Sequence, residues 1–365
     1  MNAHGPMPKS AWMFPALAVL LFAAATAAGY SFKPSSAGLA FAAVLLLILF
    51  GTVFAAVHHA EVVAERIGEP FGTLLLTLAV TIIEVALIAT IMLGEGPVTT
   101  LARDTVFAVV MIVCNGLVGI CILVGGLRYR EQDIQVSGSN LYLSVLSVLA
   151  TITLIMPNYT LTTPGPVYSV VQLGFVSTVT ILLYGVFLYT QTVRHSDYFV
   201  AATAGARHEG PQASNRAILL SVGLLLVSLL AVVLLAKKFS QVVDAGAALI
   251  GAPPAFAGIL VALLILMPEG VAAIAAARRN DLQKSINLAL GSSLATIGLT
   301  IPAVAVAAYE LDKQLVLGLP VQDMVLLLLT LLLSLLTLGS GRTNILFGLV
   351  HLVVFAVFMF MVFVP

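Results

Sequence analysis

Apolar runs of membrane-spanning length dominate this sequence and decide its fold class. A helix of about 20 residues crosses the hydrocarbon of a bilayer, and within lipid only helices and closed barrels satisfy every backbone polar group. Apolar runs bounded by charges, proline or glycine predict spans over 11–29, 38–57, 71–93, 105–127, 139–156, 166–190, 217–236, 255–277, 285–308, 321–338 and 343–364. The sequence therefore predicts an all-α polytopic membrane protein with eleven transmembrane helices.

The composition supports this class and excludes others. Hydrophobic residues make up 61% of the chain and charged residues 9%, whereas soluble proteins average about half and about a quarter. The 16 basic and 16 acidic residues cancel, so no basic field for nucleic acid is expected. Cys114 and Cys121 lie on one predicted helix, roughly 10 Å apart, which is too far for a disulfide.

The first apolar run permits two interpretations. Lys9 precedes the run from Ala11 to Ala28, and small residues end it, as in a secretory signal peptide. The run is longer than the usual apolar core of such a peptide, about 7 to 15 residues. A retained first helix is favoured, and a cleaved signal peptide stays open.

Basic residues in alternate loops predict the orientation. With the amino terminus inside, the inner segments hold Lys9, Arg66, Arg128, Arg130, Arg194, Arg207, Arg216, Arg278, Arg279, Lys284 and Arg342. The outer segments hold only Lys33, Arg103, Lys237, Lys238 and Lys313. Loops on the cytoplasmic side carry the excess of Lys and Arg. We therefore expect a cytoplasmic amino terminus and a carboxyl terminus outside, in a membrane such as the bacterial inner membrane.

Two spans carry a carboxylate near their middle. Glu84 lies in FGTLLLTLAVTIIEVALIATIML and Glu269 in FAGILVALLILMPEGVAAIAAA, each thirteen residues after a Phe. A charge at the centre of a bilayer costs about 3 kcal/mol on insertion scales, so such acids usually serve a function. The two glutamates lie on the third and eighth spans, five apart, so their helices cross in opposite directions. This arrangement predicts an inverted repeat whose two copies meet at the midplane.

The repeat divides the chain into four parts. Residues 1–37 hold an extra transmembrane helix, and residues 38–190 form the first five-helix repeat. The least hydrophobic long stretch, residues 191–216, is predicted to be an exposed cytoplasmic linker. Residues 217–365 form the second five-helix repeat.

The paired acids predict cation exchange. No Lys or Arg lies in either glutamate span, so Glu84 and Glu269 must be neutralised by protons or by a bound cation. In a site of low dielectric constant protons compete with the metal ion for the carboxylates. Two protons and one divalent cation carry equal charge, so the pair holds either. A packing role, with both acids permanently protonated, is the alternative.

Neighbouring groups supply further candidate oxygens. Pro268 lacks an N–H and frees the carbonyl of Leu264, as a ligand for a hard cation or simply through a kink. Further candidates are Asn115, Ser292, Ser293 and Thr296, with Thr81 and Thr77 ranked below them. Such groups often bond within or between helices instead. Glycines 116, 119, 291 and 298 are expected to let their helices approach the glutamate helices closely.

Three histidines, His58, His59 and His351, are not predicted to bind the transported cation within the membrane. His58 and His59, with Glu61, Glu65 and Glu69, are predicted on a loop that leads to the third span. That loop either gathers cations and senses pH or is simply solvated, and the second is favoured. His351, in the last span, is expected to be a core histidine whose ring is satisfied by neighbours.

Enzyme motifs are absent from the sequence. No Ser-His-Asp set, Walker loop or HExxH occurs, and no room remains for a nucleotide domain. An intramembrane enzyme would need a nucleophile or metal ligands beside the acids. We therefore predict a protein that is not an enzyme and has no resident cofactor, its calcium, sodium or potassium ion being a transported substrate.

Several stretches resemble a known family. HHAEVVAERIGEPFGTLLLTLAVTIIEVALI, ARDTVFAVVMIVCNGLVG, FAGILVALLILMPEG, NLALGSSLATIGLTIP and SGRTNILFGLVHL are similar to the calcium/cation antiporter superfamily, in particular its ChaA-type calcium/proton (sodium, potassium/proton) antiporters. The resemblance implies eleven spans in two inverted five-helix halves, and paired glutamates that fall here on Glu84 and Glu269. It also implies that the helices bearing Asn115 and Ser292 with Ser293 complete the site.

The sequence departs from the family pattern at two places. The segment from Gln191 to Arg216 contains only two acids, Asp197 and Glu209, where related antiporters often have a strongly acidic segment. Thr81-Ile82-Ile83 and Met267-Pro268 stand where wider family members have Gly-Asn. The choice among calcium, sodium and potassium therefore stays open.

Three functions remain to be compared. The leading hypothesis is a proton-coupled cation antiporter that works by alternating access. The alternatives are a cation channel filtered by the two glutamates and a sodium-coupled calcium exchanger. Protons, the cation and the lipid bilayer are the expected partners, and the oligomeric state stays open.

Overall fold

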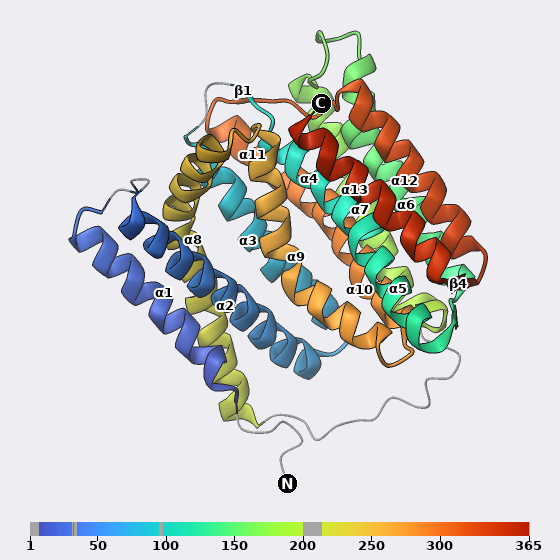
Figure 1. The fold of residues 1–365 in the computed structure, drawn as a ribbon, viewed down its shortest axis with the longest axis horizontal. Coiled ribbons are helices and arrows are strands. Elements are labelled where there is room, and N and C mark those ends of the chain that lie inside the picture. Colours follow the sequence, from blue (N-terminus) through green and yellow to red (C-terminus); the bar gives the residue numbers. More distant parts are fainter. Residues whose placement is uncertain (1–6, 31, 33–34, 95–97, 200–213, 365) are drawn as a thin grey trace. The chain divides into compact units, whose positions relative to one another are not determined.

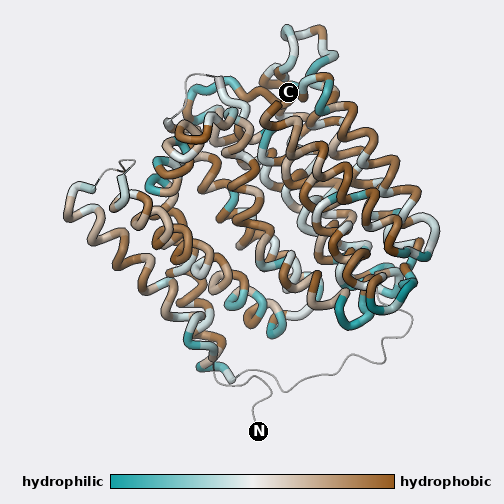
Figure 2. The backbone as a smooth tube through the Cα atoms, viewed as in Figure 1, coloured by the Kyte–Doolittle hydropathy of each residue, from teal (hydrophilic) through white to brown (hydrophobic). Residues whose placement is uncertain are grey.

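The computed structural model describes residues 7–30, 32, 35–94, 98–199 and 214–364. Within these residues eleven helical stretches are long and apolar enough to cross a membrane, which confirms the predicted fold class and number of spans. In Figure 2 the hydrophobic colour follows the helices, and the hydrophilic colour gathers at helix ends and connections. The chain is thus an integral membrane protein by length and apolar composition of its helices.

The chain folds as two compact units. The first unit comprises Met1–Gly94 and Ala206–Ala252, and the second comprises Glu95–Gly205 and Pro253–Pro365. Glu84 belongs to the first unit and Glu269 to the second. Each unit is therefore described by itself.

The first unit is a four-helix assembly built around two long helices. Its helices are α1 (Lys9–Ala27), α2 (Ser36–Ile67), α3 (Phe71–Met92) and α8 (Asn215–Ile250). Helix α2 has 32 residues and α8 has 36, and the two pack side by side (Figure 1). The side chains of Ser35 and Ser214 cap their amino ends, and Gly68 and Gly251, with φ of 76° and 65°, end them. Serine at the start and glycine just past the end are favoured helix boundaries.

Both long helices extend beyond their predicted spans, which corrects two boundaries. The predicted loop bearing His58, His59, Glu61 and Glu65 is the last part of α2, and only Glu69 lies beyond the helix. Alanine, glutamate and arginine favour helix there, although polarity ends the apolar run. His59 is fully buried, and its ring Nε2 lies 3.0 Å from the carbonyl oxygen of Ala11 in α1. Its ring therefore joins two helices of the first unit.

The second unit contains the other seven spans with short strands between them. Its chain order is β1 (Val98–Thr99), α4 (Leu101–Met111), η1 (Ile112–Leu117), α5 (Val118–Tyr129), β2 (Glu131–Asp133), α6 (Val136–Ala150), η2 (Thr151–Ile155), η3 (Met156–Tyr159), α7 (Val170–Tyr189), η4 (Thr190–Arg194) and η5 (Ser196–Phe199). It continues with α9 (Ala255–Ala277), α10 (Leu282–Ala295), η6 (Thr296–Thr300), α11 (Ile301–Glu310), β3 (Gln314–Leu315), α12 (Val321–Gly339), β4 (Arg342–Asn344) and α13 (Ile345–Phe363).

Corresponding spans of the second unit contain a π-helical turn. The span from α4 to α5 changes to a π-helix at Ile112–Leu117, and the span from α10 to α11 does so at Thr296–Thr300. A π-turn inserts an extra residue into the helical ladder and occurs often at functional sites. These two spans are the third of each predicted repeat and carry the candidate neutral ligands Asn115, Ser292, Ser293 and Thr296.

Inside the second unit, elements of one predicted repeat pack against elements of the other in reciprocal pairs. Helix α5 packs against α13, and the counterpart span packs its η6 and α11 against α7. Strand β2 pairs antiparallel with β4, and Val167 forms an antiparallel bridge with Val316. In both cases an element of one repeat meets the reciprocal element of the other. Inverted repeats related by a pseudo-twofold axis produce this pattern.

The beginning of the predicted linker is helical, and within residues 191–199 only Phe199 is buried. The span of α7 continues through η4 to Arg194, and Phe199 at the end of η5 is buried. The ring of Phe199 makes edge contacts with Tyr142 and Phe187. Residues 200–213 of the linker lie outside the described residues.

Candidate cation site

Glu84 lies in an apolar environment within the first unit. Its side chain on α3 is 1% exposed, and Ile83 and Leu87 on the same helix are also buried. Thr81 is also buried and lies one turn earlier, on the same face of the helix. Its role as a ligand beside the carboxylate stays a prediction. Helix α3 packs against α2 and α8.

Glu269 lies within a continuous helix of the second unit. It is half-buried on α9, which includes Pro268 inside the helix. Because proline has no N–H, it cannot donate to the carbonyl of Leu264 four residues earlier. Leu264 is itself buried. The Leu264 carbonyl, predicted as a ligand, therefore lies in the turn before Glu269 and receives no hydrogen bond from residue 268.

The π-turn η1 packs against α9 beside Glu269. A Cβ atom added at Gly270 would meet Leu117 of η1 at 3.8 Å, an ordinary van der Waals distance. At the other end of α9, a Cβ atom at Gly258 would lie 2.8 Å from backbone atoms of Asp104 and Thr105. Helices α4 and α9 lie against each other (Figure 1). The position of Glu269 within its unit therefore depends on the span formed by α4, η1 and α5.

The serines predicted as ligands lie on α10, which packs against α9. Ser293 is fully buried, and its hydroxyl oxygen has no hydrogen-bond partner among the described residues. Ser292 is half-buried, and Thr296 at the start of η6 is buried. A buried hydroxyl without a partner is unfavourable unless a ligand or water completes it. Ser293 is the candidate neutral ligand best supported by its surroundings.

Asn115 makes bonds that the sequence did not predict. Its amide nitrogen donates to the Thr330 hydroxyl on α12 at 2.8 Å, and its Oδ1 lies 3.1 Å from His351 Nδ1 on α13. The other ring nitrogen of His351 lies 3.0 Å from the Thr337 hydroxyl. His351 is fully buried, so the prediction of a satisfied core histidine is confirmed. The amide of Asn115 is directed toward α12 and α13.

Four glycines expected to approach the glutamate helices have their nearest neighbours on other helices of the second unit. Within the second unit, Gly116 and Gly119 approach Phe355 and the Gly348–His351 turn of α13, Gly291 approaches Tyr142 of α6, and Gly298 approaches Tyr184 of α7. These are helices of the surrounding scaffold. The close approach to the helix of Glu269 comes instead from Gly258 on that helix. Sequence shows which positions lack a side chain but not which neighbour uses the space.

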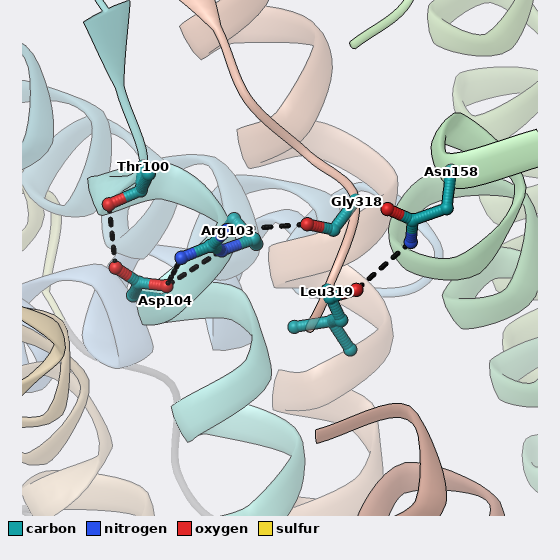
Figure 3. Close-up of polar contacts among 6 residues, drawn as sticks. All are labelled: Thr100, Arg103, Asp104, Asn158, Gly318 and Leu319. Carbon is teal, nitrogen blue, oxygen red and sulfur yellow. Dashed lines mark hydrogen bonds and ion pairs between the residues drawn. The ribbon is translucent and has the colours of Figure 1, made fainter. Parts of the chain in front are cut away.

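A polar cluster at the start of α4 was also missed (Figure 3). Asp104 accepts from Thr100 at 2.8 Å and forms an ion pair with Arg103 at 2.7 Å. Arg103 also donates to the carbonyl of Gly318 at 3.3 Å. The adjacent Arg-Asp pair at the start of a span was the available signal. The cluster ties the beginning of α4 to the segment that precedes α12.

The charged groups alone do not complete a metal site. Among the described residues, no three side chains of His, Cys, Asp or Glu form a group that could hold a metal ion. Calcium takes about 6 to 8 oxygen ligands, many of them neutral. A cation site that uses the glutamates must therefore draw on hydroxyls, carbonyls and water. The pairing of Glu84 with Glu269 stays a prediction.

Carboxylates within two apolar spans of a helical membrane protein are typical of the class of ion-transport proteins. Comparison with known proteins is more specific. The chain belongs to the sodium/calcium exchanger protein family, whose model matches residues 36–193 and 220–364. These two stretches lie almost on the two predicted five-helix repeats.

Curated relatives cover most of the chain. It is 46% identical over 323 residues to the putative ionic transporter y4hA of Sinorhizobium fredii (strain NBRC 101917 / NGR234), covering 87% of each chain. It is 37% identical over 329 residues to the sodium-potassium/proton antiporter ChaA of Escherichia coli (strain K12), covering 88% of this chain and 89% of the relative. The crystal structure of the selenium-substituted Ca2+/H+ antiporter protein YfkE shares the fold, with a TM-score of 0.71 and 17% identity over 97% of this chain and 99% of that one.

Proposed function

We propose that this chain exchanges cations for protons across a membrane, with Glu84 and Glu269 as the groups that bind either one. The observation that carries the proposal is the burial of a carboxylate inside α3 and the half-burial of another inside α9, in spans without Lys or Arg. A carboxylate inside a membrane span is neutralised by a proton or by a bound cation at lower cost than it is left charged in hydrocarbon. Competition between the two is the basis of exchange.

The chemistry of the ligands favours a hard cation. Carboxylates, hydroxyls and a backbone carbonyl are oxygen donors, which suit calcium and the alkali metal ions. We propose Thr81, Ser292, Ser293 and the carbonyl of Leu264 as the neutral oxygens. The antiporter relative from Escherichia coli is named for sodium and potassium, and YfkE for calcium, so all three ions are candidates.

The proposed location is a bacterial inner membrane. The amino terminus would face the cytoplasm and the carboxyl terminus the outside, because eleven of the 16 Lys and Arg residues lie in the predicted inner segments. In that orientation inward flow of protons would drive cations outward. Alternating access of the two repeats would carry either ligand across.

Transport by purified protein in liposomes tests the proposal. With an imposed pH gradient, calcium, sodium and potassium are tested in turn, and at least one should move against the proton flow. Glu84→Gln and Glu269→Gln should each reduce exchange to the level of empty liposomes while the protein remains in the membrane. The matched control is Glu310→Gln, which changes an exposed acid at the end of α11.

The same assay separates the alternatives. A cation channel carries current without any counter-ion gradient, and a sodium-coupled exchanger moves calcium when only a sodium gradient is imposed. Either glutamate variant exchanging at the wild-type rate contradicts the proposed roles of the carboxylates.

A further inference from the structure

A buried chain of polar side chains links α13, the π-turn η1 and α12 within the second unit. His351, Asn115 and Thr330 are each fully buried, and Thr337 completes the chain on the other side of the imidazole. We propose that His351 is a positioning residue for the exchanger, holding Asn115 so that η1 keeps its place against the Glu269 turn of α9. The inference rests on the proposed function for its transport readout.

The hydrogen bonds among these side chains fix which atom donates and which accepts at each step. The Thr330 hydroxyl donates to the sulfur of Met111 at 3.4 Å, so its oxygen accepts from the Asn115 amide nitrogen. Asn115 then presents its carbonyl oxygen to His351, and a carbonyl only accepts. The proton of the neutral imidazole is therefore on Nδ1, and Nε2 accepts from Thr337. Thr330, Asn115, His351 and Thr337 are thus all hydrogen-bonded through their side chains.

Two threonines and one glycine fit the neighbouring helices to this row of hydrogen bonds. Thr330 and Thr337 are seven residues apart on α12, about two turns, and therefore lie on one face. Gly119 lies one turn after Asn115, where a Cβ atom would be 3.1 Å from both the Gly348 carbonyl oxygen and the Cβ of His351. The missing side chain at Gly119 lets α13 come close enough for the imidazole to reach the amide. Close packing at small residues is the usual basis of such polar contacts in membranes.

The hydrogen bonds of His351, Asn115 and Thr330 are connected to the candidate site through the backbone of η1. Asn115 lies in the middle of this turn, and Leu117 lies near Gly270 of α9, the residue after Glu269, where an added Cβ atom would be 3.8 Å away. A π-turn is a rare single-turn bulge in an α-helix that occurs often at functional sites, and the side-chain bonds of Asn115 join this one to α12 and α13. Loss of the His351 bond would leave the carbonyl of Asn115 buried without a partner, which is costly. The turn would then relax, and Leu117 would shift relative to Glu269.

The test is a double-mutant cycle read as cation affinity. In proteoliposomes, His351→Leu should raise the cation concentration for half-maximal exchange about tenfold, as expected for loss of one buried hydrogen bond. His351→Asn carries an amide nitrogen at the position of Nδ1 and should stay within about threefold of wild type. Asn115→Leu combined with His351→Leu should be no worse than Asn115→Leu alone, because both act through one contact.

A matched control separates positioning from loss of any buried polar group. Thr153→Val removes a fully buried hydroxyl that bonds only to its own helix, at Leu149, and should leave the cation affinity unchanged. Unchanged affinity in His351→Leu, or additive effects in the double variant, overturns the inference. If the wild-type protein exchanges none of the three ions, the proposed function fails instead. The cycle is then read from melting temperatures, where additivity of the two substitutions equally overturns the inference.

Discussion

Gly258 lies where α9 crosses α4, and a methyl group there is expected to displace the helix that carries Glu269. A Cβ atom at this position would lie 2.8 Å from the carbonyl carbon of Asp104 and the amide nitrogen of Thr105. Ordinary contacts begin at 3.4 Å, so the helices must separate by about 0.6 Å, the difference between the two values. Both obstacles are backbone atoms, which cannot rotate away.

The expected cost follows from overpacking. Inserting a methyl group into a well-packed interior costs about 1–3 kcal/mol. Gly258→Ala should therefore lower the melting temperature of the detergent-solubilised protein and raise the cation concentration for half-maximal exchange. The affinity changes because Glu269 lies on the same helix, three turns further on.

Gly185→Ala provides the matched control in the same unit. Gly185 lies on α7, and a Cβ atom there would have no neighbour within 4 Å. Replacing a helical glycine by alanine in open space stabilises by up to about 1 kcal/mol. Its melting temperature should equal or exceed that of the wild type. If Gly258→Ala melts as high as Gly185→Ala, the close crossing of α9 and α4 is refuted.

Two further predictions concern groups outside the candidate site. Asp104→Asn should destabilise the protein strongly, because Arg103 is only 15% exposed and removing one member of a buried pair costs about 3–5 kcal/mol. The double variant Arg103→Gln with Asp104→Asn should melt above the single variant, and equal melting temperatures would contradict a paired cluster. Burial raises the pKa of Tyr168 to about 12, and its hydroxyl donates to the carbonyl of Ile152 at 2.5 Å. The neutral phenol therefore contributes stability that is fully present below about pH 10, the usual pKa of tyrosine, and is lost as the pH rises toward 12. Tyr168→Phe should lose less of its melting temperature than the wild type over that interval, and identical losses would contradict the assignment.

Much of the fold follows from local properties of the chain. All eleven predicted spans occur as apolar helices, and only their ends differ. The largest differences are at α2 and α8, where polar helix-forming residues continue the helix beyond the apolar run. Hydropathy reports which residues can lie in hydrocarbon, whereas these two helices end where Gly68 and Gly251 cap the backbone.

The surroundings of the candidate ligands depend on distant parts of the chain. Asn115 was singled out as an intramembrane amide, but its partner His351 lies 236 residues later. The same holds for Gly298, whose neighbour Tyr184 comes from the other predicted repeat. Sequence periodicity predicts which residues share one face of a helix, but only the packed structure shows which other helix that face contacts.

The sequence alone determined the membrane class and the number of spans, and it placed Glu84 and Glu269 near the middle of apolar runs, because the cost of placing each residue in hydrocarbon is a property of the residue and its place in a run. Only the tertiary structure decided that Asn115 faces His351, that Gly258 brings α9 onto α4, and that Ser293 holds a buried hydroxyl without a partner among the described residues. Those outcomes depend on which helices pack together, and packing selects among faces that hydropathy does not distinguish.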